Sequence, residues 1–245
     1  MAYYLTIDQG NTVAKLALWD DTREIDYLVD EGLTAERIET FVDGREIRSA
    51  LYCSVASEMP AIIDELHSIT RDVKRLTARM PLPILVEYGS PCSLGADRIA
   101  AAVGALATFP GEQVLVVDIG TAVTYDVVTA DRRFVGGNIA PGLKMRLDSL
   151  HRYTARLPQL EVPEEVSGDE PVLGHDTASA MIRGALYGVA GAITYYHSRL
   201  DPGTRVLLTG GDARVIRPLC NIPITVDDHL VNKGLNRILL YNEDK

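Results

Sequence analysis

Two short, mainly apolar runs in this chain each end at an aspartate that is followed two residues later by a glycine. The run Tyr3–Ile7 leads into Asp8-Gln-Gly and then into a second β-rich run, Val13–Trp19. Similarly, the run that begins at Val114 leads into Asp118-Ile-Gly and a further apolar run. Strand-length apolar runs separated by a glycine turn predict two β-hairpins. Because the hairpins lie about half the chain apart, we expect two similar halves.

The remaining pattern predicts the other strands and helices of each half. In the first half we expect a strand at 25–29, a helix at 33–42, a strand at 47–55, a helix at 59–70, a strand at 82–86 and a helix at 99–107. In the second half we expect a strand at 134–142, helices at 143–153 and 178–199, a strand at 205–209 followed by a helix, an edge strand at 222–226 and a closing helix at 230–241. Turn formers at 109–113 place the boundary between domains 1–112 and 113–245. The prediction is an α/β protein with a mixed five-stranded sheet, flanked by helices, in each domain.

The sequence Asp-x-Gly between two strands is also common in ordinary structural turns. Two copies in matching contexts, however, favour a functional role. Glycine permits a positive φ and lets a ligand approach the backbone, where free N–H groups can bind phosphate oxygens. A carboxylate repels polyphosphate unless a cation, usually Mg²⁺, bridges the two. The pair of hairpins therefore predicts a site for a metal-bound nucleotide.

A second loop, Tyr88–Arg98, precedes the helix of small apolar residues at 99–107. Asp97 is either a helix cap or a base that accepts the proton of a substrate hydroxyl as it attacks a phosphoryl group. Arg98 either holds a substrate carboxylate or forms a surface ion pair with Asp97. In the second half, Thr177 is either a helix cap or a ligand hydroxyl, and the small residues of the helix at 178–199 imply close approach of another helix.

Composition limits the kind of partner. The chain has 245 residues, 47% of them apolar, and a formal net charge of −10 without a Lys/Arg cluster, so we expect a small-molecule ligand and no nucleic acid. Its three cysteines lack metal-ligand spacing and indicate a reducing compartment. We find neither a signal sequence nor an apolar stretch long enough to cross a bilayer, so we expect a cytoplasmic protein without a membrane partner.

Six short motifs occur in an order that is typical of one family: Asp8-Gln-Gly-Asn-Thr12, Gly95-Ala-Asp-Arg98, Asp118-Ile-Gly-Thr-Ala122, Gly137-Asn-Ile-Ala-Pro-Gly142, Gly174-His-Asp-Thr177 and Leu208-Thr-Gly-Gly211. Together they resemble the type III pantothenate kinases of the acetate and sugar kinase, Hsp70 and actin superfamily, from residue 3 to about residue 240. The resemblance implies two ribonuclease-H-like (actin-like ATPase) domains. It also implies ATP-dependent phosphorylation of the pantothenate 4′-hydroxyl, the first step of coenzyme A synthesis.

The resemblance also assigns residues to ligands. It implies that ATP, with Mg²⁺ near Asp8, is bound by Asp8, Gln9, Gly10, Asn11, Thr12, Val13, Ala14, Lys15 and Thr121. Pantothenate would be bound by Tyr88, Gly95, Ala96, Asp97, Arg98 and Thr177, with Asp97 as the general base. Thr177 would reach the site across a homodimer interface, and Asp118 would bind K⁺ or NH₄⁺. The segment Thr209–Gly211 would lie beside the adenosine. Gln9 departs from the aliphatic residue that is usual in the family.

Two other functions fit the same pattern. One is a kinase of another small alcohol, such as a sugar, and the other is a nucleotide-binding regulatory protein without turnover. Intact Asp97 and Arg98 argue against the regulatory protein, because a protein that only binds has no need of a base at the acceptor site.

Overall fold

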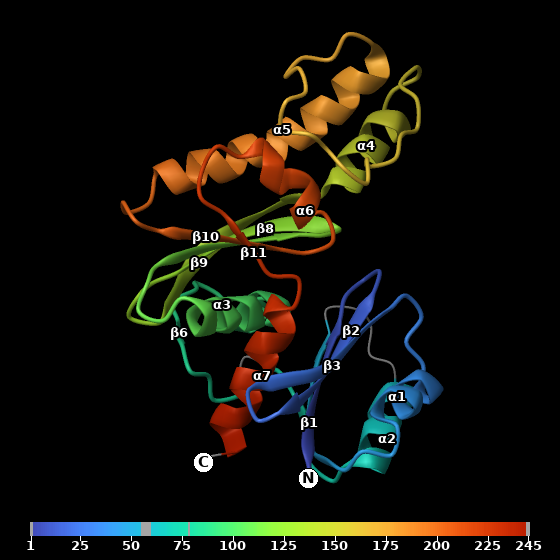
Figure 1. Ribbon diagram of the computed structural model, residues 1–245, viewed down its shortest axis with the longest axis vertical. Coiled ribbons are helices and arrows are strands. Elements are labelled where there is room, and N and C mark those ends of the chain that lie inside the picture. The colour runs from blue at the N-terminus through green and yellow to red at the C-terminus, as the bar shows by residue number, and fades with distance from the viewer. Residues whose placement is uncertain (1, 55–59, 78, 244–245) are drawn as a thin grey trace. The chain divides into compact units, whose positions relative to one another are not determined.

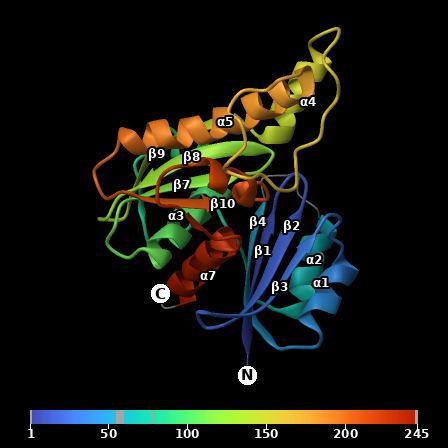
Figure 2. The same cartoon turned by 45° about the horizontal axis from the view of Figure 1, so that its top comes forward.

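The computed structural model describes residues 2–54, 60–77 and 79–243 and divides into two compact units (Figures 1 and 2). The first unit comprises Met1–Pro110, Asp131–Phe134 and His229–Lys245, and the second comprises Gly111–Ala130 and Val135–Asp228. The expected boundary between residues 112 and 113 therefore differs from this division mainly in the closing helix, which belongs to the first unit.

The sheet of the first unit begins with the expected antiparallel meander. Strands β1 (Tyr3–Gln9), β2 (Ala14–Asp20) and β3 (Arg23–Asp30) pair in sequence, and β4 (Ile47–Ser54) lies parallel to β1 on its other side. The fifth strand is β5 (Val73–Arg75), so the strand order is β3-β2-β1-β4-β5.

The prediction that residues 82–86 form the fifth strand of this sheet was wrong. Only β6 (Leu85–Val86) is extended there, and it pairs with Arg133 and Phe134 at the start of β9. Prolines at 81 and 83 remove backbone N–H donors from this segment, which disfavours a place inside a sheet. Strand β5 was missed because three residues with a lysine and an arginine give no apolar run.

Helices α1 (Ala35–Val42) and α2 (Pro60–Ile69) pack on one face of this sheet, as Figure 1 shows. Thr34 caps α1 as its Oγ1 accepts the Arg37 N–H at 3.2 Å. The expected last strand residue Val55 and first helix residue Met59 lie outside the described residues.

Helices α3 (Ala96–Thr108) and α7 (Leu230–Glu243) pack against each other and contact the sheet of the first unit. Glycines permit their close approach, because a Cβ on Gly234 would clash with the Ala100 carbonyl and one on Gly104 with the Leu230 carbonyl. This contact explains why α7, although it closes the chain, belongs to the first unit.

The second unit repeats the strand order of the first. Its strands are β7 (Val114–Ile119), β8 (Ala122–Val128), β9 (Arg133–Pro141), β10 (Arg205–Thr209) and β11 (Thr225–Val226), in the order β11-β10-β7-β8-β9. Strand β11 is at the edge, as its proline-containing segment predicted. Because β6 adds to the start of β9, this sheet has six strands and not the expected five. The repeated order confirms the two similar halves.

The helices of the second unit form one core with its sheet. Helices α4 (Leu143–Arg152), α5 (Thr177–Ser198) and the short α6 (Ala213–Ile216) contribute Leu147, Val189 and Ile216 to it. The described residues also form two short 3₁₀ helices, η1 (Pro91–Ser93) in the first unit and η2 (Arg217–Leu219) in the second. Among the described residues, no helix combines the length and the apolar character that a membrane span requires.

Candidate active site

The first hairpin places an acidic group at the end of a buried strand. Asp8 and Gln9 are the last residues of β1 and lie opposite Lys15 and Ala14 of β2. Asp8 is only 9% exposed, and Gln9 is buried as well. The Gln9 side chain accepts a hydrogen bond from the Tyr52 hydroxyl of β4 at 2.6 Å. The polar residue that departs from the family pattern thus has a partner inside the first unit.

The turn of this hairpin is open to a ligand. The Gly10 N–H donates to the Val13 carbonyl at 3.0 Å and closes the turn. Asn11 and Thr12, at its tip, are exposed. A short polar turn with accessible hydroxyl, amide and N–H groups can bind phosphate oxygens.

Asp97 lies in the first turn of α3 and is not its cap. The N-cap is Gly95, which makes no side-chain cap hydrogen bond, so the interpretation of Asp97 as a capping residue was wrong. Asp97 Oδ1 accepts the Arg98 N–H at 2.8 Å and folds back so close to Gly95 that a Cβ there would clash with it. Burial raises the pKa of Asp97, and the hydrogen bond from the Arg98 backbone and the charge of Arg98 only partly oppose this rise.

Arg98 is packed between aromatic rings. It is 5% exposed, and its Cζ lies 5.7 Å from the ring centroids of both Tyr88 and Phe134. These rings contact each other edge to face, with centroids 6.1 Å apart. Cation–π contacts help to hold the guanidinium in place. Because Arg98 is buried, its expected position on the surface was wrong. Phe134 was missed because an apolar residue at the start of a strand carries no local signal of a site.

Asp8 and Asp97 of the first unit share a buried neighbour, Cys53. Cys53 of β4 lies opposite Asp8 in the parallel register and is fully buried. Burial raises the pKa of its thiol well above the ordinary value, and the charges of Asp8 and Asp97 raise it further. The hairpin of β1 and the start of α3 therefore bring Asp8 and Asp97 to the same part of the unit.

The second hairpin has the same local structure. Asp118 of β7 lies opposite Thr124 of β8 and opposite Thr209 of β10. The Gly120 N–H donates to the Ala122 carbonyl at 3.0 Å, so Gly120 and Thr121 form the turn. Thr121 is exposed, as a contact to a nucleotide would require.

Two further loops of the second unit contact the end of this hairpin through glycine residues. The Gly142 N–H donates to the Thr121 carbonyl at 3.0 Å, and a Cβ on Gly142 would clash with the Gly120 carbonyl. Gly210, with φ +91°, lies so close that a Cβ would clash with Asp118 Oδ1 and the Ile119 carbonyl. The ends of β7, β9 and β10 thus converge at one edge of the second sheet.

Thr177 is the first residue of α5 and is exposed in the second unit. It is not the helix cap, because Asp176 accepts the Ser179 N–H at 2.8 Å and forms a capping box with that residue. The hydroxyl of Thr177 therefore remains accessible to a ligand. Of the small residues of α5, Gly188 lies against Arg146 of α4, whereas Gly184 faces open space.

The acidic residues suit a cation that is bound together with phosphates. Among the described residues, no three His, Cys, Asp or Glu side chains are grouped closely enough to hold a metal alone. Mg²⁺ is typically held by one or two carboxylates plus substrate phosphates. A single carboxylate behind each open turn, Asp8 or Asp118, matches that pattern.

Solved structures with the same fold point to one class of protein. The chain is similar to a candidate Baf family transcriptional activator from Campylobacter jejuni, with a TM-score of 0.62, 21% identity and coverage of 98% and 100% of the two chains. It is also similar to a candidate 2-dehydro-3-deoxygalactonokinase from Sinorhizobium meliloti, with a TM-score of 0.63, 15% identity and coverage of 98% and 99%. The two repeated sheets therefore define a protein of the actin-like ATPase and sugar kinase fold.

Sequence relatives narrow this class. A model of the type III pantothenate kinase family matches residues 4–199. The type III pantothenate kinase of Bacteroides fragilis is 38% identical over 98% of this chain and 99% of its own, and that of Porphyromonas gingivalis is 36% identical over 99% and 100%. The chain belongs to the type III pantothenate kinase family and is a kinase.

Proposed function

We propose that this enzyme transfers the γ-phosphoryl group of ATP to the 4′-hydroxyl of pantothenate in the cytoplasm, with Asp97 as the general base. Family membership supports the substrates and the step in coenzyme A synthesis. The observation that carries the assignment of the base is the half-buried Asp97 carboxyl in the first turn of α3, beside the buried Arg98. Burial raises the pKa of the Asp97 carboxyl, and a base works best when its pKa approaches the working pH.

Asp97 acts on the substrate hydroxyl. Because Oδ1 accepts the Arg98 N–H, we assign Oδ2 as the oxygen that accepts the hydroxyl proton. Arg98, held against Tyr88 and Phe134, binds the pantothenate carboxylate with its guanidinium. Fixing both ends of a small substrate aligns its hydroxyl with the phosphoryl group, and such positioning accounts for much of the rate in phosphoryl transfer.

The two hairpins hold the nucleotide. Residues Asp8–Lys15 form the first phosphate loop, Thr121 contacts ATP from the second hairpin, and Thr209–Gly211 lies beside the adenosine. Asp8 would hold Mg²⁺, and Asp118 would hold K⁺ or NH₄⁺. Such cations neutralise the negative charge of the phosphates when they are bound.

The remaining contacts to pantothenate come from Gly95, Ala96 and Thr177. We propose a homodimer in which Thr177 of the partner subunit completes the substrate site. The exposed start of α5 and the accessible Thr177 hydroxyl support this arrangement.

A coupled assay of ADP release tests the function. We expect turnover with ATP and pantothenate, stimulation by K⁺, and no turnover with a panel of sugars. Asp97→Asn should lower kcat by about 10²- to 10⁴-fold, the contribution of a general base, with little change in ATP affinity. The control Asp26→Asn alters a half-exposed aspartate of β3 and should keep full activity. Near-normal turnover by Asp97→Asn would exclude Asp97 as the base, and turnover of a sugar alone would exclude pantothenate as the acceptor.

A further inference from the structure

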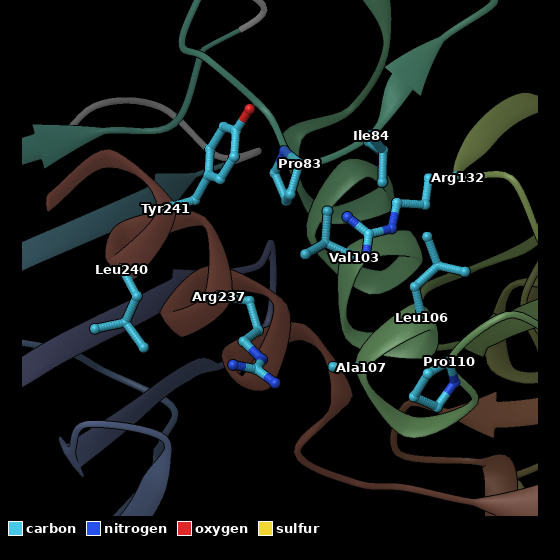
Figure 3. Close-up of a pocket in the computed structure, with 10 residues that line it drawn as sticks. All are labelled: Pro83, Ile84, Val103, Leu106, Ala107, Pro110, Arg132, Arg237, Leu240 and Tyr241. Atoms are coloured by element: carbon cyan, nitrogen blue, oxygen red, sulfur yellow. The ribbon is translucent and has the colours of Figure 1, made fainter. Parts of the chain in front are cut away.

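A cavity of about 380 Å³ opens within the first unit, and neither Asp8 nor Asp97 is among the residues that line it (Figure 3). It lies between the second half of α3, the last turns of α7 and the segments around Pro83 and Arg132. Along α3, the lining residues Val103 and Ala107 are six and ten residues from Asp97, or about 9 and 15 Å at the rise of an α-helix. The cavity is therefore separate from the proposed substrate site.

Most of the residues that line the cavity are apolar. Val103 and Leu106 of α3 line one side of the cavity, and Leu240 of α7 lines another. The adjacent residues Pro83 and Ile84 form a third part of the wall. A cavity of this volume is within the range of small-molecule sites, and its walls can bury a hydrocarbon or ring.

Two arginines, Arg132 and Arg237, also line this cavity, and both are exposed (Figure 3). Throughout the described part of the chain, neither guanidinium has an ion-pair or hydrogen-bond partner. The adjacent Arg133 differs, since it pairs with both Glu87 and Asp131. In a protein of net charge −10, two guanidinium groups without a counter-charge beside an apolar cavity are complementary to an anion with an apolar body.

We propose that this cavity binds a small amphipathic anion, that is, a carboxylate or phosphate monoester attached to a hydrocarbon. Arg132 and Arg237 bind the anionic group, because a guanidinium presents paired donors to a carboxylate or phosphate. The walls formed by α3, α7 and Pro83 bury the hydrocarbon. The inference rests on the cavity alone and is independent of the proposed reaction.

Titration of the full-length protein, with ¹³C-labelled methyl groups, tests this proposal by NMR. The probes are octanoate, octyl phosphate, octanol and inorganic phosphate. We expect octanoate or octyl phosphate to shift the methyl resonances of Val103, Leu106 and Leu240, and whichever binds more tightly identifies the anionic group. Octanol and inorganic phosphate should bind at least about tenfold more weakly, since each lacks one of the two contacts.

Variants of the two arginines distinguish binding in this cavity from nonspecific binding to the protein surface. Arg132→Gln and Arg237→Gln should each weaken the charged probe by about fivefold, the effect of losing one exposed charge contact. The control Arg199→Gln, an exposed arginine outside the cavity, should leave the affinity unchanged. Circular dichroism verifies that each variant is folded. If one of the two arginine variants does not fold, the other is enough to test the proposal.

Three results would overturn the proposal. The first is the absence of methyl shifts with both charged probes at millimolar concentration. The second is equal binding of octanol or inorganic phosphate, which would remove the need for an amphipathic anion. The third is an equal loss of affinity in Arg199→Gln and the two cavity variants.

Discussion

Asp8, the carboxylate at the end of β1, lies directly opposite the buried thiol of Cys53 in the parallel register of β1 and β4. The corresponding strands of the second unit place Asp118 opposite Thr209. Asp8 and Asp118 therefore each have a small neutral neighbour on the adjacent parallel strand, β4 or β10. A neutral neighbour adds no charge repulsion to the carboxylate.

The first prediction concerns the reactivity of the thiols. Burial raises the pKa of Cys53 well above its ordinary value and that of Cys220 to about 11, whereas Cys92 is exposed. Because the thiolate is the reactive form, iodoacetamide at pH 8 should modify Cys92 about a hundredfold faster than the other two. Mass spectrometry of the digested protein measures this. All three should react at similar rates in denaturant, and rapid labelling of Cys53 in the folded protein would contradict its burial.

The second prediction concerns stability and pH. Because the folded-state pKa of Asp97 is raised, the native protein retains this proton where the unfolded chain has already lost it. Ionised Asp97 therefore lowers stability progressively as the pH rises from about 4, the ordinary aspartate pKa, through the raised value. Asp97→Asn should unfold at a higher temperature than the wild type at pH 7, and the difference should shrink toward pH 4. Differential scanning fluorimetry measures both, and Asp26→Asn should show no such gain.

The activity should also depend on the ionisation of Asp97, but it requires the ionised form, which lowers the stability. The base must be ionised, so kcat/KM should fall as the pH drops through the raised pKa of Asp97, above the range expected for an exposed aspartate. A pH–rate profile with saturating ATP measures this limb. An acid limb centred at the ordinary aspartate value would contradict the raised pKa.

The third prediction concerns the hydrogen bond from Tyr52 to Gln9. Both side chains are buried, so Tyr52→Phe should cost about 1 to 2 kcal/mol because it removes a donor from a buried amide oxygen. Gln9→Leu should cost a similar amount, since it removes the acceptor of a buried hydroxyl. The double variant should cost less than the sum of the two, because neither polar group remains. Urea unfolding measures all three, and simple additivity would show that the bond contributes nothing.

The fourth prediction compares two adjacent glycines. Gly210 has a positive φ and no space for a Cβ beside Asp118, whereas Gly211 has neither restriction. Gly210→Ala should cost about 2 kcal/mol or more and weaken ATP binding, because the loop must move away from Asp118. Gly211→Ala should change the free energy of unfolding by only about 0.5 kcal/mol. Equal effects of the two variants would mean that the approach of Gly210 to Asp118 is unimportant.

The candidate site divides into residues that local pattern identifies and residues that it cannot identify. Asp8 and Asp118 were found because apolar runs on both sides predict strands, and a glycine two residues after each aspartate predicts a turn. Phe134 and Cys53 were missed as site residues because each belongs to a strand whose own pattern is ordinary. They reach Arg98 and Asp8 only through contacts between distant segments.

The pattern of apolar residues by itself determined the two hairpins, the main helices and the similarity of the two halves, because these depend on neighbours a few residues apart. The tertiary structure alone decided that β6 pairs with β9, that α7 packs against α3, and that Arg98 lies between two rings. It also decided the pKa of Asp97, which is raised by burial. Burial and pairing depend on segments that are far apart in the chain, and no local period encodes which of them meet.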